Sequence, residues 1–234
     1  MANPTYRNKI LSQLSRSDFA LLAPYLDPID LPVRTRLETP NKTISHVTFI
    51  DDGIVSIVAT GPRRLAIEVG VIGWEGCTGH PVILGAGRSP LDTYVQVAGA
   101  GRRISAEHLL GAMSQSVSLR NLLFKSIQGF NLQVAFTALA NGQATLDQRL
   151  ARWLLMAHDR VQSGEISLTH DFLAIMLGVR RPGVTVSLTN LQDLGLIKKM
   201  KRGTLLVADR PGLEKLVSKF YGTPEAEMER LLGD

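Results

Sequence analysis

The sequence predicts an α+β protein: an N-terminal antiparallel β-roll of jelly-roll type, one long helix, and a C-terminal helical unit that contains a small β-hairpin. Two changes of hydrophobic pattern indicate this division. Short runs rich in Val, Ile and Thr, separated by Gly, Pro and Asp, fill residues 32–104. From residue 105 onward, apolar residues recur at helical spacing. We therefore expect three parts with boundaries 1–115, 116–142 and 143–234.

Composition limits the class of protein. Of the 234 residues, 44% are hydrophobic and 20% are charged, so the chain can bury a real core. The formal net charge of +5 is compatible with a polyanionic partner but does not by itself indicate one. Cys77 is the only cysteine, which excludes an internal disulfide and any all-cysteine zinc or iron–sulfur site. No apolar run can span a membrane and residues 1–7 lack a signal core, so we expect a cytoplasmic protein.

The N-terminal part begins with short helical patterns at residues 8–14 and 17–26, the second with Ser17 as its expected N-cap. Two β-prone runs, 44–50 and 54–58, then flank Asp51-Asp52-Gly53 and predict a β-hairpin. Residues 65–72 and 93–97 continue the strands. Ser105 is the expected cap of the helix that follows the β-roll.

One long segment without proline, from about Ser116 to Asn141, predicts the central helix. Its apolar residues cover more than one face, so more than one face must be buried. One side can pack on the β-roll, and the other side is most simply covered by the same helix of a second copy in a symmetric dimer. The alternative is the central core helix of a monomer. The apolar positions are Leu119, Leu122, Leu123, Phe124, Ile127, Phe130, Leu132, Val134, Phe136 and Leu139.

The last third of the chain has the pattern of a winged helix-turn-helix. Thr145 is expected to cap a helix that runs to about Val161. Thr169 is expected to cap a short helix over 170–177, Gly178 follows at once, and a second helix starts near Arg181-Pro182. Its apolar stripe is Val184, Leu188 and Leu191. Two β-prone runs, 196–200 and 204–207, then flank Lys201-Arg202-Gly203 as a basic hairpin.

This arrangement suits duplex DNA. The major groove accepts one helix, whose exposed side chains contact base edges, while basic side chains of a hairpin contact phosphates. A generic helical packing motif with a solvated basic face is the alternative explanation. The expected DNA-contacting residues are Thr169 at the start of the first helix, Arg180, Arg181, Thr185 and Thr189 on the second, and Lys199, Lys201 and Arg202 of the hairpin.

Three groups of residues resemble the Crp/Fnr family of bacterial transcription regulators: 72–76 with Arg88-Ser89, the helix opening at 147–154, and 177–181 continuing to Asn190-Leu191. The resemblance covers nearly the whole chain. It implies a cyclic-nucleotide-binding-like β-roll, a dimerisation helix and a winged helix-turn-helix. It further implies a homodimer on a two-fold symmetric operator, and contact with RNA polymerase if the protein is an activator. It places the effector site at Glu75, Gly76, Arg88 and Ser89.

The sequence departs from the cyclic-nucleotide pattern. Trp74 interrupts the Gly-Glu pair, Asp92 adds a negative charge near the expected phosphate, and Val134-Ala135 offers no hydroxyl to a purine. A cyclic nucleotide is therefore possible but disfavoured, and the single Cys77 excludes the iron–sulfur branch of the family. For Glu75 and Arg88, an internal ion pair is the alternative to ligand contact.

We therefore expect a DNA-binding transcription regulator controlled by an unidentified signal. No nucleophile triad, metal cluster or phosphate-binding loop indicates an enzyme, and no certain cofactor is expected. Two alternatives stay open: a constitutive DNA-binding regulator with a degenerate sensor, and a small-molecule-binding protein without a DNA function. The effector, the operator sequence and the direction of regulation are left open by the sequence.

Overall fold

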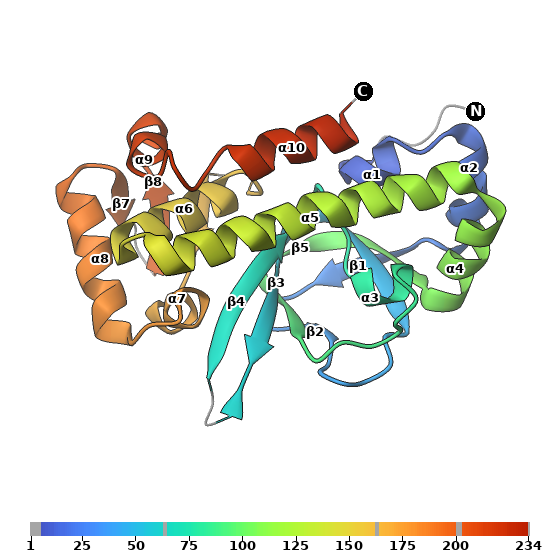
Figure 1. Ribbon diagram of the computed structural model, residues 1–234, viewed down its shortest axis with the longest axis horizontal. Helices are drawn as coiled ribbons and strands as arrows, with labels where there is room; N and C mark the ends of the chain where they lie inside the picture. Colours follow the sequence, from blue (N-terminus) through green and yellow to red (C-terminus); the bar gives the residue numbers. More distant parts are fainter. Residues whose placement is uncertain (1–5, 63–64, 162–163, 200–202, 234) are drawn as a thin grey trace.

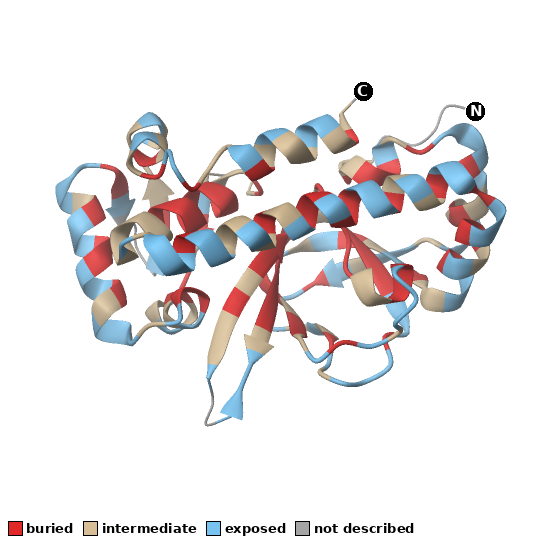
Figure 2. Ribbon diagram, viewed as in Figure 1, coloured by how far each residue is buried: buried red, intermediate tan, exposed pale blue. Residues whose placement is uncertain are grey.

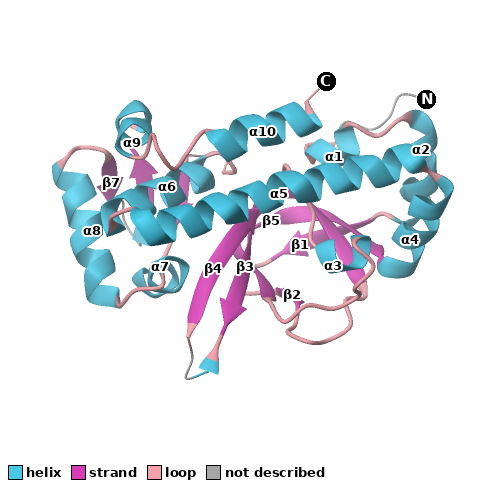
Figure 3. Cartoon of the chain, viewed as in Figure 1, coloured by secondary structure: helices cyan, strands magenta, loops and turns pink. Residues whose placement is uncertain are grey.

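The computed structural model describes residues 6–62, 65–161, 164–199 and 203–233. Helix α5 runs across the whole molecule, and the N-terminal sheet lies along one of its sides (Figure 1). Residues 146–216 gather at one end of α5, and the helices within residues 9–25 and 106–115 gather at the other (Figure 3). The helices are α1 (Lys9–Ser12), α2 (Arg16–Leu22), the 3-10 helix η1 (Ala23–Tyr25), α3 (His80–Ile83), α4 (Ala106–Gln115), α5 (Val117–Gln143), α6 (Leu146–His158), α7 (His170–Leu177), α8 (Arg181–Asp193), α9 (Arg210–Leu216) and α10 (Thr223–Leu232).

Two antiparallel sheets confirm the α+β class. In the larger sheet the strand order is β1-β5-β3-β4, and β2 also pairs with β5; in the smaller sheet the order is β6-β8-β7. Strands of the larger sheet enclose their own apolar cluster, which includes Leu31, Ile50 and Val95. The strands are β1 (Asp27–Leu31), β2 (Arg36–Glu38), β3 (His46–Thr60), β4 (Ala66–Ile72), β5 (Asp92–Ser105), β6 (Glu165–Ser167), β7 (Ile197–Lys199) and β8 (Thr204–Val207).

The predicted hairpin at Asp51-Asp52-Gly53 is wrong. These residues lie within the single long strand β3, whose pairing with β5 shifts register between Ile50 and Asp52 and again between Asp52 and Ile54. Gly53 takes up the irregularity with a φ of 90°, so the segment forms bulges instead of a turn. The chain turns back into β4 only after Thr60.

The start of α2 also differs from the expectation. Ser15, and not Ser17, is the N-cap, because its hydroxyl accepts the backbone N–H of Asp18 at 3.1 Å. The other caps agree with the sequence. Ser105 caps α4, and Thr145 caps α6 in a reciprocal capping box with Gln148.

One side of α5 is largely exposed, with Leu132 half-buried within it. Positions separated by three or four residues fall on this side, and its large apolar members Val117, Phe124 and Leu139 are 61%, 42% and 44% exposed. Figure 2 shows exposed turns recurring along α5. We call this surface the α5 stripe, and it consists of Val117, Asn121, Phe124, Gln128, Leu132, Ala135 and Leu139.

The acidic C-terminal tail forms a helix that the sequence did not predict. Helix α10 lies along α5 on a different side from the sheet (Figure 1). Leu232 of α10 is buried with Ile10 and Leu11 of the N-terminal helices, and Lys9 forms an ion pair with Glu229 at 3.2 Å. The second buried side of α5 is therefore covered by the chain itself, and only the α5 stripe is left for a partner.

The C-terminal unit packs directly on the N-terminal sheet. Its apolar cluster, built mainly from α6, α7 and α8, also includes Ile54 of β3 and Val71 of β4. Across this boundary, Gln96 Nε2 donates to Met176 Sδ at 2.7 Å, and Arg34 lies 5.6 Å from the ring centroid of Phe172. A change in the sheet can therefore reach the helices of the C-terminal unit through direct contact.

Candidate functional site

Helices α7 and α8 form the helix-turn-helix that the sequence predicts. The hydroxyl of Thr169 caps α7 by accepting the backbone N–H of Phe172 at 3.2 Å. Gly178 ends α7 in the left-handed conformation, with a φ of 60°, which turns the chain sharply into α8. Arg180 is the N-cap residue of α8, and Pro182 lies in its first turn.

The two sides of α8 differ as a DNA-recognition helix requires. Val184, Leu188 and Leu191 are buried against the rest of the unit. The opposite side, formed by Arg181, Thr185 and Thr189, is exposed to solvent. The structure therefore brings the predicted recognition residues together on one open surface.

Neighbouring side chains that the sequence did not single out contact this surface. His170 Nδ1 lies 3.1 Å from the hydroxyl of Thr185. Asp171 lies 3.8 Å from the guanidinium of Arg181, and both side chains are well exposed, so the pair contributes little stability. Arg181 therefore stays available to a base edge or a phosphate.

The basic hairpin is described only in part. Strands β7 and β8 are antiparallel, with Lys199 paired to Leu205, and Lys198 is exposed. The predicted phosphate contacts Lys201 and Arg202 lie outside the described residues. Of the expected hairpin, the described residues therefore show Lys198 open to solvent on a strand that contacts α8.

The four predicted effector residues do not line one cavity. Arg88 and Ser89 line a cavity of about 330 Å³ between the sheet, α3 and α5. Glu75 lines a different cavity of about 280 Å³, beside α5, α10 and the end of α6. Gly76 lies in the N-terminal core region, where its carbonyl accepts Asn8 Nδ2 at 2.8 Å. The four expected residues are thus divided among three places.

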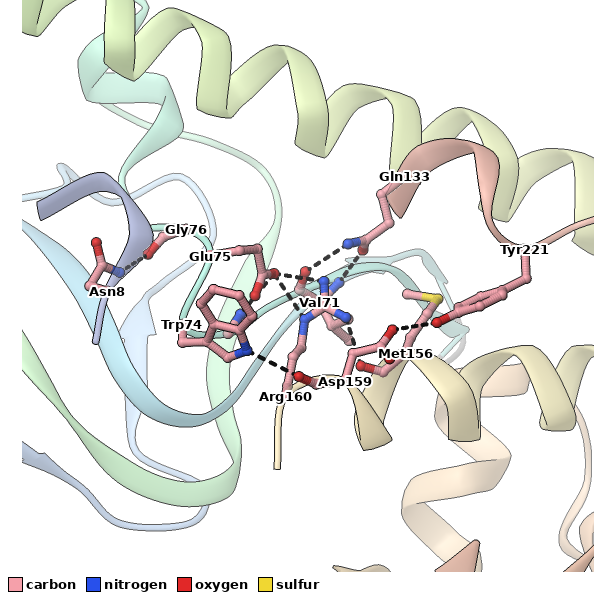
Figure 4. Close-up of polar contacts among 11 residues, drawn as sticks. Asn8, Val71, Trp74, Glu75, Gly76, Gln133, Met156, Asp159, Arg160 and Tyr221 are labelled. Atoms are coloured by element: carbon pink, nitrogen blue, oxygen red, sulfur yellow. Dashed lines mark hydrogen bonds and ion pairs between the residues drawn. The ribbon is translucent and has the colours of Figure 1, made fainter. Parts of the chain in front are cut away.

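Glu75 is engaged by the C-terminal unit (Figure 4). Its Oε1 accepts Arg160 Nε at 2.9 Å and Nη2 at 2.6 Å, and it also accepts the backbone N–H of Gly73 at 3.1 Å. The indole of the adjacent Trp74 donates to the carbonyl of Asp159 at 3.0 Å. An internal ion pair of Glu75 was one alternative at the sequence level, but its partner is Arg160 and not Arg88.

Arg160 is buried, with only 7% of the residue exposed. Burial by itself would lower the pKa of its guanidinium, but the charge of Glu75, followed by that of Asp159, more than offsets this and raises it. Arg160 Nη1 also donates to the carbonyl of Met156 at 2.6 Å. We call Trp74, Glu75, Asp159 and Arg160 the interdomain clamp, because the first two follow β4 and the last two follow α6.

A second buried acid lies on the same boundary. Glu68 of β4 accepts the indole N–H of Trp153 of α6 at 2.7 Å. Its other oxygen, Oε2, has no hydrogen-bond partner among the described residues. Burial raises the pKa of Glu68 to about 7, because hydrogen bonds from Ser56 and Trp153 and the charges of Arg160 and Arg152 only partly compensate for the lost water.

This pKa predicts a pH-dependent stability. Between the ordinary value of 4.5 and about 7, the folded protein binds a proton that the unfolded chain does not. The contribution of Glu68 to stability therefore falls as the pH rises through this range, by on the order of 3 kcal/mol, and levels off above it. Chemical unfolding of the wild type and of Glu68→Gln from pH 5 to 8 measures this contribution as a difference. Burial lowers the pKa of His80 to about 4, so His80 acts in the opposite sense below about pH 6.5 and is common to both proteins. The stability of Glu68→Gln, which keeps the acceptor for Trp153, should therefore gain on that of the wild type as the pH rises from 5 to 8; a difference that stays constant would reject the assignment to Glu68.

Other kinds of chemical site have no support in the described part of the chain. Within it, no three His, Cys, Asp or Glu side chains are grouped closely enough to hold a metal ion. Burial raises the pKa of the Cys77 thiol well above its ordinary value, so this cysteine is a poor nucleophile. Among the same residues, no helix combines the length and apolar character needed to cross a bilayer.

Comparison with known proteins agrees with this geometry. A profile of the Crp-like helix-turn-helix domain matches residues 148–216. A search of curated proteins finds no significant match.

Solved structures show the same overall fold. A putative Crp/Fnr-family transcriptional regulator from Eubacterium rectale is 19% identical with a TM-score of 0.70, over 89% of this chain and 97% of that one. FixK2 from Bradyrhizobium japonicum is 17% identical with a TM-score of 0.70, over 82% and 96%. The c-di-GMP-responsive global regulator CLP from Xanthomonas campestris is 16% identical with a TM-score of 0.65, over 82% and 99%. Residues 148–216 are therefore a Crp-like helix-turn-helix domain, carried on a chain with the fold of the Crp/Fnr-family transcriptional regulators.

Proposed function

We propose that the protein is a homodimeric, DNA-binding transcription regulator of the cytoplasm, controlled by a small molecule that binds the N-terminal unit. The observation that carries this proposal is the open side of α8. Arg181, Thr185 and Thr189 are exposed together, on the opposite side from the buried stripe that anchors the helix. Arginine can bond guanine O6 and N7 together, and a threonine methyl can contact the methyl of thymine.

The α5 stripe supports the dimer. It extends over most of the 27 residues of α5 and contains no charged residue. Such a surface is self-complementary when two copies pair around a two-fold axis. The pairing would present two α8 helices to successive turns of a duplex, which is the arrangement that a symmetric operator needs. The occupant that we assign to the stripe is therefore the α5 stripe of a second copy.

Selection of bound duplexes from a random pool tests the DNA-binding proposal. The wild type is expected to enrich a two-fold symmetric sequence and to bind it with a steep dependence on salt. Pro182 and Val186 are exposed on α8 and offer no side-chain hydrogen bond to a base, so the enriched half-site should depend on Arg181, Thr185 and Thr189. Recovery of no preferred sequence would reject sequence-specific regulation.

Arg181→Ala should change the specificity of this selection. If Arg181 contacts one base pair, its loss costs about 1–3 kcal/mol there and relaxes the preference at that position only. Arg103→Ala, which changes an exposed arginine of β5 far from α8, is the matched control and should leave the preference unchanged. An unaltered preference in Arg181→Ala would remove this residue from direct base recognition.

A constitutive regulator is the second candidate. The engagement of Glu75 by Arg160 favours it, because a carboxylate held in a buried ion pair is not free to accept a ligand hydroxyl. The two candidates differ in one measurable property. A ligand that stabilises the protein and also changes its affinity for the selected operator would exclude constitutive binding.

A further inference from the structure

The cavity that contains Arg88 and Ser89 has mostly apolar walls. Ile57 of β3, Leu91 next to β5, and Ile127 and Phe130 of α5 line it, together with Pro81 of α3. Its volume of about 330 Å³ is at the lower end of the range for small-molecule sites. An occupant must therefore be small and must present an apolar body to most of the wall.

One part of the wall favours a single negative charge. Arg88 forms no ion pair and no side-chain hydrogen bond within the part of the chain that the structure describes. The buried hydroxyl of the adjacent Ser89 accepts the backbone N–H of Leu91 at 3.1 Å, and its own hydrogen remains available to donate. A guanidinium and a hydroxyl that both donate are the partners of a carboxylate or a phosphate.

Two further wall residues oppose a more highly charged ligand. Glu38 is buried at the same cavity, where its Oε1 accepts the backbone N–H of Gly79 at 2.6 Å. Burial lowers the pKa of His80 to about 4, so its imidazole adds no positive charge at neutral pH. A dianion would meet only one cation and would lie near a carboxyl group.

A nucleotide fits these walls poorly. Its ribose and base carry several polar groups that need partners when they are buried. Glu75, the expected ribose acceptor, lines the other cavity and is bonded to Arg160. On α5, Ile127, Phe130 and Asn131 line the cavity, and of these three only Asn131 can offer a base a side-chain hydrogen bond.

We propose that this cavity binds a small monoanionic carboxylate with an apolar body, such as a short aliphatic carboxylic acid, whose charged end contacts Arg88 and Ser89. Binding of the acid does not depend on the proposed function. Only its role as the signal that controls DNA binding rests on that function. The bound chain would contact Ile127 and Phe130 of α5, and the ring of Phe130 already lies 4.8 Å from that of His80. A ligand in the cavity would therefore contact the helix that carries the α5 stripe.

Calorimetry and thermal-shift measurements on the full-length protein test this class of ligand. Butyrate, pentanoate and hexanoate should bind with affinity rising about fourfold per added methylene until the cavity is full. Hexanamide, which has the same body without the charge, should bind at least roughly tenfold more weakly than hexanoate. Tighter binding of cyclic AMP or inorganic phosphate than of hexanoate, or equal binding of the amide, would overturn the proposal.

Two variants locate the charged end. Arg88→Gln should weaken hexanoate binding by roughly tenfold or more. Arg103→Gln, which changes an exposed arginine of β5, should leave hexanoate binding unchanged. The comparison of hexanoate with hexanamide on the wild type needs no variant, so a poorly folded Arg88→Gln does not prevent a decision. Operator binding is measured on the same sample. Sequence-specific DNA binding without any binding of the acid series would reject the ligand class and leave the DNA-binding function intact.

Discussion

Replacing Glu75 by alanine is expected to lower the free energy of unfolding by about 3–5 kcal/mol, because it leaves the guanidinium of Arg160 buried without its partner. The side chains of Arg160 and Glu75 are only 8% and 12% exposed, and they join the loop after β4 to the end of α6. The same change removes the main polar contact of the interdomain clamp. Chemical unfolding of the variant and the wild type measures the loss.

The double variant Glu75→Leu/Arg160→Met separates the charge from the packing. Since it removes both charges together, it should recover much of the stability that Glu75→Ala loses. Arg7→Met is the matched control, because Arg7 pairs with Asp52 at 2.8 Å with both side chains substantially exposed, and its loss should cost no more than about 1 kcal/mol. A Glu75→Ala variant as stable as Arg7→Met would show that the clamp is not a stabilising contact.

Phe124→Asp is expected to convert the protein to a monomer at concentrations where the wild type is dimeric. Each copy would lose about 1.5–3 kcal/mol of apolar burial, and the two-fold axis places the change in the interface twice. Association should therefore weaken at least roughly 100-fold, and operator binding should weaken with it. Sedimentation measures the first effect and titration of the selected operator the second.

Leu110→Asp is the control for this change. Leu110 of α4 is 43% exposed, against 42% for Phe124, and it lies off the α5 stripe. The control should keep the oligomeric state and the operator affinity of the wild type. A monomeric wild type, or a dimeric Phe124→Asp, would reject the α5 stripe as the dimer interface.

Most local structure follows from the sequence. The caps Ser105, Thr145 and Thr169, the left-handed Gly178 and the buried stripe of α8 all lie where the pattern predicts them. These features depend on residues within one or two helical turns of each other, so a short window of sequence contains their cause. The wrong hairpin at Gly53 shows the limit of such a window, because the same Asp-Gly signal forms a bulge when β5 pairs across it.

The composition of the N-terminal cavity was predictable only in part. The Arg88-Ser89 pair indicated an anion site in the sequence, and the structure places both residues at one cavity. Glu75 appeared to belong with them, but a partner 85 residues away in the chain holds it elsewhere. No local signal in the sequence distinguishes a glutamate that contacts a ligand from one that forms an internal ion pair, since both can follow a strand in the same kind of loop.

By itself, the sequence determined the α+β class, the long central helix and the helix-turn-helix with its open recognition side, because periodicity and capping are local. Only the tertiary structure decided which surfaces meet. It placed the acidic tail along α5 as α10, left the α5 stripe exposed, and joined the two units through Glu75 and Arg160. These contacts form between segments distant in the chain, where the burial of apolar surface and the pairing of buried charges select the partners.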